Sequence, residues 1–134
     1  MTITERRRAV AEALPVRPRD FFVLLVLAGG ELHGYGIMKG VERESRGSVR
    51  LEVGSLYRTL DRLLAAGLIA EAGADAAAAA AKGAMATTAA DGERRRPYRL
   101  TSFGSKVMRA EAERLQEVVR MVQAKGLLGG AGEP

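Results

Sequence analysis

Hydroxyl and guanidinium groups recur on one side of residues 52–69, a segment predicted to be helical. The opposite side carries apolar residues at helical spacing, which form a stripe expected to be buried: Val53, Leu56, Leu60, Leu63, Leu64 and Gly67. Rotated away from the stripe are four side chains that can donate hydrogen bonds outward: Ser55, Arg58, Thr59 and Arg62. A helix anchored on one side and cationic on the other fits a groove of a polyanion such as nucleic acid.

Several side chains of this helix are candidates for direct contact with DNA. Gly54 and Ser55 lie in its first turn, where small residues let a phosphate or a base edge approach free backbone N–H groups. Arg58 can reach a guanine in the major groove. Tyr57 lies between the two faces, so we expect its ring in the core and its hydroxyl near a phosphate. A solvated outer face is the alternative for each residue taken alone.

Cationic and aromatic residues elsewhere in the chain extend this candidate surface. Arg94, Arg95 and Arg96 precede a predicted strand, and on alternating strand geometry at least one faces each side. Such arginines lie near phosphates or enter the minor groove, so binding should weaken steeply with salt. Tyr35 and Lys39 belong to an earlier helix and are further candidates for phosphate contact. Solvated charge is the competing interpretation of Lys39 and the three arginines.

Composition excludes several other classes of function. The 134 residues include 21 Lys+Arg, 16 Asp+Glu, one histidine and no cysteine. Disulfides, thiol catalysis and a multi-histidine metal cage are therefore excluded within one subunit, and we expect no cofactor and no enzymatic activity. The most apolar run, residues 21–28, is far shorter than the roughly 20 residues needed to span a membrane. We expect a soluble, cytoplasmic protein without a membrane partner.

The order of predicted elements indicates a mainly α fold with a small two-stranded wing. We expect helices over 4–14 (ended by Pro15), from Asp20 as N-cap to Gly29, over 34–45 and over 53–67, then strands 68–71 and 97–100. Val49–Leu51 is either a short strand or an extended link. Between the two strands lies an alanine-rich segment, 72–93, predicted to be an extended wing tip. Thr101 or Ser102 caps a final helix that runs to Gly126.

The final helix carries an apolar seam of the kind that packs lengthwise on another helix. Its members are Met108, Ala112, Leu115, Val119 and Val122, spaced 4, 3, 4 and 3, and Val118 and Met121 widen it. This is more apolar surface than one small domain needs to cover.

Three segments in this order resemble the PadR family of bacterial transcriptional regulators. They are PRDFFVLLVLAGGELHGYGIMKGVE with its LHGY turn, VGSLYRTLDRLLAAGLI, and RRRPYRLTSFG, and together they cover roughly residues 18–124. The resemblance implies a homodimer joined through a single C-terminal helix, a palindromic operator in double-stranded DNA, repression, and room for a small-molecule effector near the dimer interface. Two features depart from the family: the long alanine-rich wing, and Gly36 and Gly40 inside a helix, each about 1 kcal/mol worse than Ala.

The predicted organisation is therefore a winged helix-turn-helix with a long C-terminal dimerisation helix. We expect an N-terminal helical extension (1–15), a DNA-binding domain (16–101), the dimerisation helix (102–128) and a disordered tail (129–134). The alternative function is a winged-helix module that binds proteins and has no specific affinity for DNA.

Overall fold

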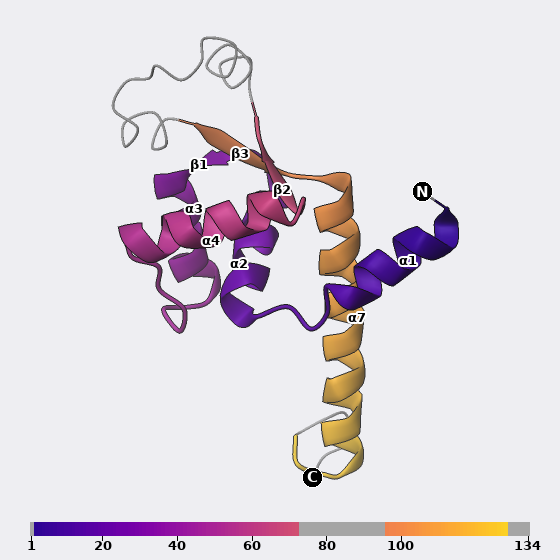
Figure 1. Cartoon of the computed structure of the whole chain (residues 1–134). Coiled ribbons are helices and arrows are strands. Elements are labelled where there is room, and N and C mark those ends of the chain that lie inside the picture. The colour runs from indigo at the N-terminus through magenta and orange to yellow at the C-terminus, as the bar shows by residue number, and fades with distance from the viewer. Residues whose placement is uncertain (1, 73–95, 129–134) are drawn as a thin grey trace.

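Three helices form a bundle in the computed structural model, which describes residues 2–72 and 96–128 (Figure 1). They are α2 (Pro18–Leu27), α3 (Gly34–Glu44) and α4 (Val53–Ala65). Residues 49–51 between α3 and α4 form no strand, so the extended link is the correct alternative. The expected tail and most of the expected wing tip lie outside the described residues.

Helix α2 begins earlier than the sequence predicts. Its N-cap is Arg17, and Pro18 occupies the first turn, where the missing N–H of proline costs no hydrogen bond. The prediction of Asp20 as the N-cap is therefore wrong. Asp20 lies inside the first turn, where it is 8% exposed and pairs with Arg62 of α4.

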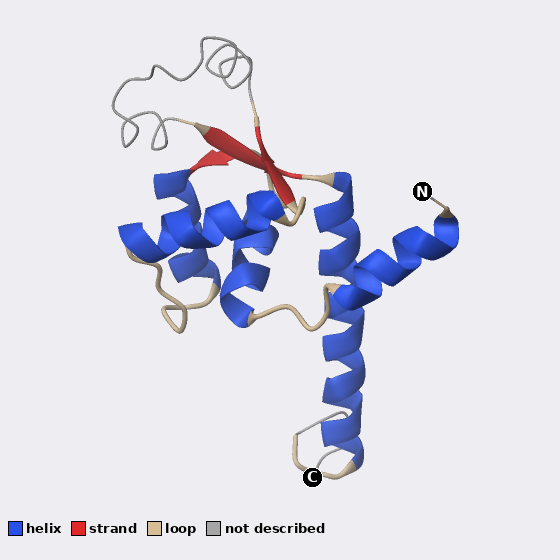
Figure 2. Cartoon of the chain, viewed as in Figure 1, coloured by secondary structure: helices blue, strands red, loops and turns tan. Residues whose placement is uncertain are grey.

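The wing is a three-stranded antiparallel sheet rather than the predicted two-stranded one (Figure 2). Strands β2 (Ile69–Glu71) and β3 (Pro97–Leu100) pair as expected, with Ile69 opposite Leu100. The added strand, β1 (Leu32–His33), pairs with the other edge of β3, with Leu32 opposite Tyr98. The LHGY turn thus fixes the start of α3 against the wing.

Two further helices flank this unit. Helix α1 (Ile3–Glu12) is capped by Thr2 and packs against α7 (Ser102–Ala124), which extends beyond the bundle (Figure 1). The N-cap of α7 is Thr101, whose hydroxyl donates to the carbonyl of Gly67 at 2.7 Å and accepts from the N–H of Gly104 at 2.9 Å. These bonds join the start of α7 to the end of α4. Ile3, at the start of α1, is 65% exposed.

The core lies between the bundle, the sheet and the first turns of α7. Its buried members come from all of these elements: Val23, Leu24, Leu27, Ile37, Val41, Leu51, Leu56, Leu60, Leu63, Leu68, Ile69, Tyr98 and Val107. The leucine stripe of α4 supplies the centre, as predicted for Leu56, Leu60 and Leu63. Val53, predicted to belong to the stripe, is 49% exposed at the first position of the helix.

Gly40 explains one departure from the family pattern. It is buried in α3, and a Cβ atom built on it would lie 2.7 Å from Cγ1 of Val26 on α2. Glycine therefore lets α2 and α3 approach closely, which offsets its low helix propensity.

Candidate nucleic-acid interface

The outward face of α4 is formed by residues that share one side of the helix and are exposed. Gly54, Arg58 and Asp61 lie on this face. The side chain of Arg58 folds back toward the N-terminus of α4. Its Nη1 lies 3.6 Å from the position that a Cβ on Gly54 would occupy. Thr59, which was predicted on this face, is instead 1% exposed, because it lies beside the leucine stripe. Asp61 was not singled out in the sequence, although its spacing from Arg58 places it there.

Ser55 caps α4 instead of presenting a free hydroxyl. Its Oγ accepts from the backbone N–H of Glu52 at 3.0 Å and donates to the Glu52 carbonyl at 3.1 Å. The predicted contact of this hydroxyl with a phosphate or base would have to compete with these bonds. Gly54 leaves the first turn open, since among the described residues only the Arg58 guanidinium lies within 4 Å of a Cβ at that position.

One flank of α4 meets the start of α3. A Cβ on Gly34 would lie 2.6 Å from the hydroxyl oxygen of Tyr57, so this glycine leaves room for the half-buried tyrosine. Tyr35 is 65% exposed, and the Lys39 ammonium lies 5.6 Å from the centroid of its ring. The structure thus places the predicted residues Tyr35, Lys39 and Tyr57 along a common edge of α3 and α4.

The opposite flank of α4 carries Arg62, which was predicted to be an outward donor. Its guanidinium makes two hydrogen bonds to the carboxylate of Asp20, at 2.8 and 3.1 Å. These bonds raise the pKa of Arg62 above its ordinary value. The side chain is still 43% exposed, so it both holds α2 against α4 and keeps part of its surface open. Its first role is therefore structural.

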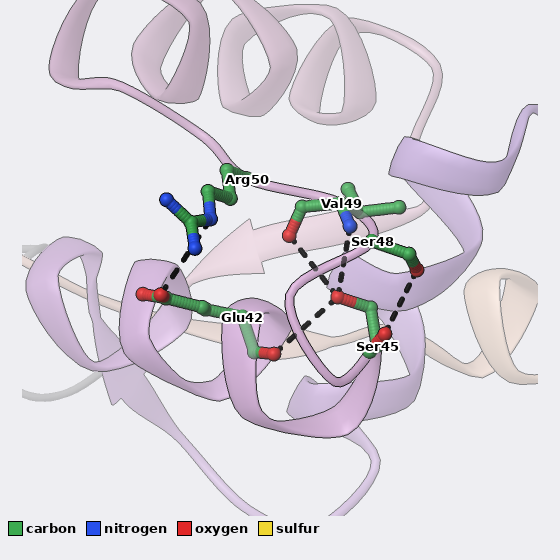
Figure 3. A network of polar contacts seen from close by, with 5 residues as sticks. All are labelled: Glu42, Ser45, Ser48, Val49 and Arg50. Carbon is green, nitrogen blue, oxygen red and sulfur yellow. Dashed lines mark hydrogen bonds and ion pairs between the residues drawn. The ribbon is translucent and has the colours of Figure 1, made fainter.

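The turn between α3 and α4 is fixed by Ser45, as Figure 3 shows. The buried hydroxyl accepts from the N–H of Val49 at 3.0 Å and lies 3.1 Å from the Val49 carbonyl, to which it donates. Ser48 in turn donates to the Ser45 carbonyl at 2.8 Å. Arg50 is held more loosely, with its Nε 3.7 Å from Oε2 of Glu42. This network sets where α4 begins.

In the wing, Arg96 is paired rather than free. Its Nη1 donates to Oε2 of Glu71 at 2.7 Å, which joins the open ends of β2 and β3. Both side chains are partly exposed, so the pair stabilises the wing weakly. Arg94 and Arg95 lie outside the described residues.

A second candidate surface runs along α7. The predicted seam begins in the core, where Met108 packs against buried residues, and continues past Glu111 as exposed apolar side chains. These are Leu115, Val118, Val119 and Met121, which are 38–53% exposed. Ala112 is exposed and Val122 is half-buried. In Figure 1, α7 extends past the bundle, and within the described part of the chain these apolar side chains stay partly exposed.

Comparison with known families decides the class of protein. The model of a family described as "Transcriptional regulator PadR-like family" matches residues 23–110, which include the bundle, the wing and the first turns of α7. The chain belongs to this family. It is a DNA-binding transcriptional regulator, and the predicted absence of enzymatic function follows from membership of a non-enzymatic family.

Solved structures share the fold of this PadR-like chain. A transcriptional regulator from Clostridium thermocellum is 21% identical, with a TM-score of 0.56 over 78% of this chain and 89% of that one. A PadR family transcription regulator from Clostridium difficile R20291 is 19% identical, with a TM-score of 0.57 over 81% and 97%. No curated protein matched the sequence. No helix in residues 2–72 or 96–128 is long and apolar enough to span a membrane.

Proposed function

We propose that two copies of this regulator bind one palindromic operator and repress transcription from it. The observation that carries the proposal is the outward face of α4, where Arg58 stands exposed over Gly54. The absence of a side chain at Gly54 allows close approach of a base edge or phosphate, and Arg58 can donate two hydrogen bonds to guanine. Repression is what the family resemblance implies.

Tyr35 and Lys39 support insertion of α4 into a major groove. They lie on α3 beside Tyr57, at the edge of the same surface. A phosphate backbone next to the inserted helix would meet a phenol and an ammonium there. Arg94 and Arg95 remain proposed contacts of the wing, whereas Arg96 would have to leave Glu71 to reach DNA.

The apolar face of α7 supports the homodimer. Leu115, Val118, Val119 and Val122 would pack against the same residues of a second copy, with Ala112 at the edge and Met108 where the seam meets the core. An isologous contact of this kind gives two α4 helices related by a two-fold axis. The half-sites of the operator would then lie about 34 Å apart or a multiple of it.

A hollow beside this face supports an effector site. It measures about 490 Å³ and is lined mainly by apolar residues of the α1–α2 link and α2, including Pro15, Phe21 and Phe22, together with Leu115 of α7. An apolar molecule of ordinary ligand size fits such a space. A ligand bound there would contact both the DNA-binding unit and the dimerisation helix.

A gel-shift titration on the upstream region of the protein's own gene tests the proposal. We expect the wild-type protein to retard the DNA at low salt. In Arg58→Ala, the free energy of operator binding should weaken by about 1–3 kcal/mol. Equal decreases on operator and random DNA would make Arg58 a phosphate contact rather than a base contact. Absence of any retarded band would favour the alternative, a winged-helix module that binds proteins.

A further inference from the structure

Four arginines line one hollow on the flank of α4 that faces away from Tyr57. The hollow measures about 510 Å³ and lies between the first turn of α2, the α3–α4 turn and α4. Arg17, Arg19, Arg50 and Arg62 contribute guanidinium groups, and Asp20 is the single carboxylate among the lining residues. Apart from Arg62, none of these arginines was predicted to contact DNA, and Arg17 also lines the hollow beside α7.

The charge of this hollow is only partly compensated. Asp20 is already engaged by Arg62, at 2.8 Å. Arg50 is 73% exposed and its contact with Glu42 is long, at 3.7 Å. Within the described residues, Arg17 and Arg19 form no ion pair. Concentrated positive charge without a partner costs free energy through mutual repulsion, which a bound anion would relieve.

The position of the hollow identifies the anion. A helix with its side chains is about 10–12 Å wide, and the major groove is about 12 Å wide, so an inserted helix has a phosphate backbone along each flank. In Figure 1, β1 and the first turn of α3 lie above α4, and the α3–α4 turn and the start of α2 lie below it. Tyr35 lies in that first turn of α3, and the Lys39 ammonium lies 5.6 Å from the centroid of its ring. The lower flank is where the hollow lies.

Arg58 and Arg62 connect the outward face to the hollow. They are four residues apart and therefore neighbours on the surface of α4, and both are exposed. A duplex that contacts Arg58 with its bases would thus bring a backbone toward the side of Arg62. The Ser45 network of Figure 3 fixes Ser48 and Val49 at the wall of this hollow, and Arg50 follows Val49 directly in the sequence.

We propose that the hollow is a second phosphate clamp, which binds the backbone on the wall of the major groove opposite the wall that Tyr35 and Lys39 contact. This inference rests on the proposed insertion of α4 into that groove. In this clamp, Arg17, Arg19 and Arg50 contact phosphate oxygens. Arg62 keeps its two hydrogen bonds to Asp20 and so positions the first turn of α2.

A triple variant, Arg17→Ala, Arg19→Ala and Arg50→Ala, tests the clamp without disturbing the Arg62–Asp20 pair. The matched control removes the same charge from α1 through Arg6→Ala, Arg7→Ala and Arg8→Ala, which are all exposed. In Figure 1, α1 lies on the side of α7 away from α4. DNA affinity is measured for each protein over a range of salt concentrations, and circular dichroism verifies the fold. We expect the slope of log K against log salt to fall by about one for each phosphate that the clamp variant no longer binds, and to stay unchanged in the control.

Ethylation interference gives the second readout. In the clamp variant, ethylation of the phosphates on one strand of each half-site should no longer weaken binding. In Lys39→Ala, ethylation of the phosphates on the other strand should no longer weaken it. If the wild type binds DNA but the clamp variant keeps its slope, or matches the α1 control, the clamp is overturned and the proposed function stands. If the wild type itself shows no salt-dependent binding to duplex DNA, both are overturned.

Discussion

At the scale of single residues, glycine and arginine give α4 its outward chemistry. Gly54 keeps the first turn open, and Arg58 lies over it without an ion pair in the described part of the chain. Arg62 looks equivalent to Arg58 in the sequence but is bound to Asp20, a residue 42 positions away. Helical spacing predicts which side a residue faces, whereas its partner depends on how distant elements pack.

Gly54→Ala should separate stability from DNA binding. A Cβ there makes only ordinary van der Waals contact, and glycine in a helix is up to about 1 kcal/mol less favourable than alanine, so the variant should be more stable. Its added methyl group should weaken DNA binding, because it occupies the space left for a phosphate or base. Urea unfolding and gel-shift titration measure the two effects.

The matched control for this prediction is Gly29→Ala, which adds a methyl group at an exposed position at the end of α2. DNA affinity should be unchanged in the control. Unchanged affinity in Gly54→Ala as well would show that DNA does not approach the first turn of α4.

At the scale of elements, local patterns predicted most of the fold. The leucine stripe predicted α4, Pro15 and Gly29 predicted helix ends, and the strand predicted over 97–100 has the bounds of β3. The strand β1 was missed because two residues carry no alternation, and its pairing with β3 joins positions about 65 residues apart. The burial of Thr59 was missed because Thr59 borders the leucine stripe. Whether such a residue is buried depends on the elements that pack against the helix, and helical spacing does not identify them.

Gly40→Ala should destabilise the bundle although alanine is the better helix former. The new Cβ would lie 2.7 Å from Cγ1 of Val26, a β-branched side chain with little freedom to move away. We expect a decrease of about 1–3 kcal/mol in the free energy of unfolding, as for other overpacked cores. Gly36→Ala is the control, since its Cβ would meet the mobile end of Leu32 at 3.3 Å and should cost less. Equal stabilities of the two variants would contradict the close helix approach.

At the scale of the whole molecule, Glu111 is the buried charge of α7, at the point where the helix leaves the core. It is 2% exposed and accepts two hydrogen bonds from Arg114, at 2.7 and 2.9 Å. These bonds lower the pKa of Glu111, and a backbone hydrogen bond from Val16 in the α1–α2 link adds to the effect against the opposing effect of burial. Glu111 is thus a buried carboxylate whose two side-chain hydrogen bonds both come from Arg114 on the same helix, and it lies beside Val16 in the wall of the hollow next to α7.

Glu111→Gln should reduce stability in a pH-dependent way. Because the folded pKa is depressed, the ionised carboxylate contributes stability above its unfolded pKa of about 4.3, and this contribution disappears as pH falls through the folded pKa. We expect a decrease of about 1–2 kcal/mol at neutral pH and a smaller one in acid, measured by urea unfolding at one protein concentration. The control is Glu117→Gln, whose exposed pair with Arg120 has the same spacing and should contribute less than about 1 kcal/mol. A pH-independent difference would contradict this role for the charge.

Val118→Glu should separate the two subunits and thereby weaken operator binding. Val118 lies near the middle of the apolar face of α7, 39% exposed in the single chain, and a buried glutamate without a partner would be strongly unfavourable. The control, Gln116→Glu, adds the same charge on another side of α7. Light scattering after gel filtration should give the mass of one chain for the valine variant and of two for the control and the wild type.

Since a monomer presents only one α4 to the duplex, its affinity for the full operator should fall toward that for a half-site. A Val118→Glu protein that stays dimeric would place the contact between subunits elsewhere on the molecule.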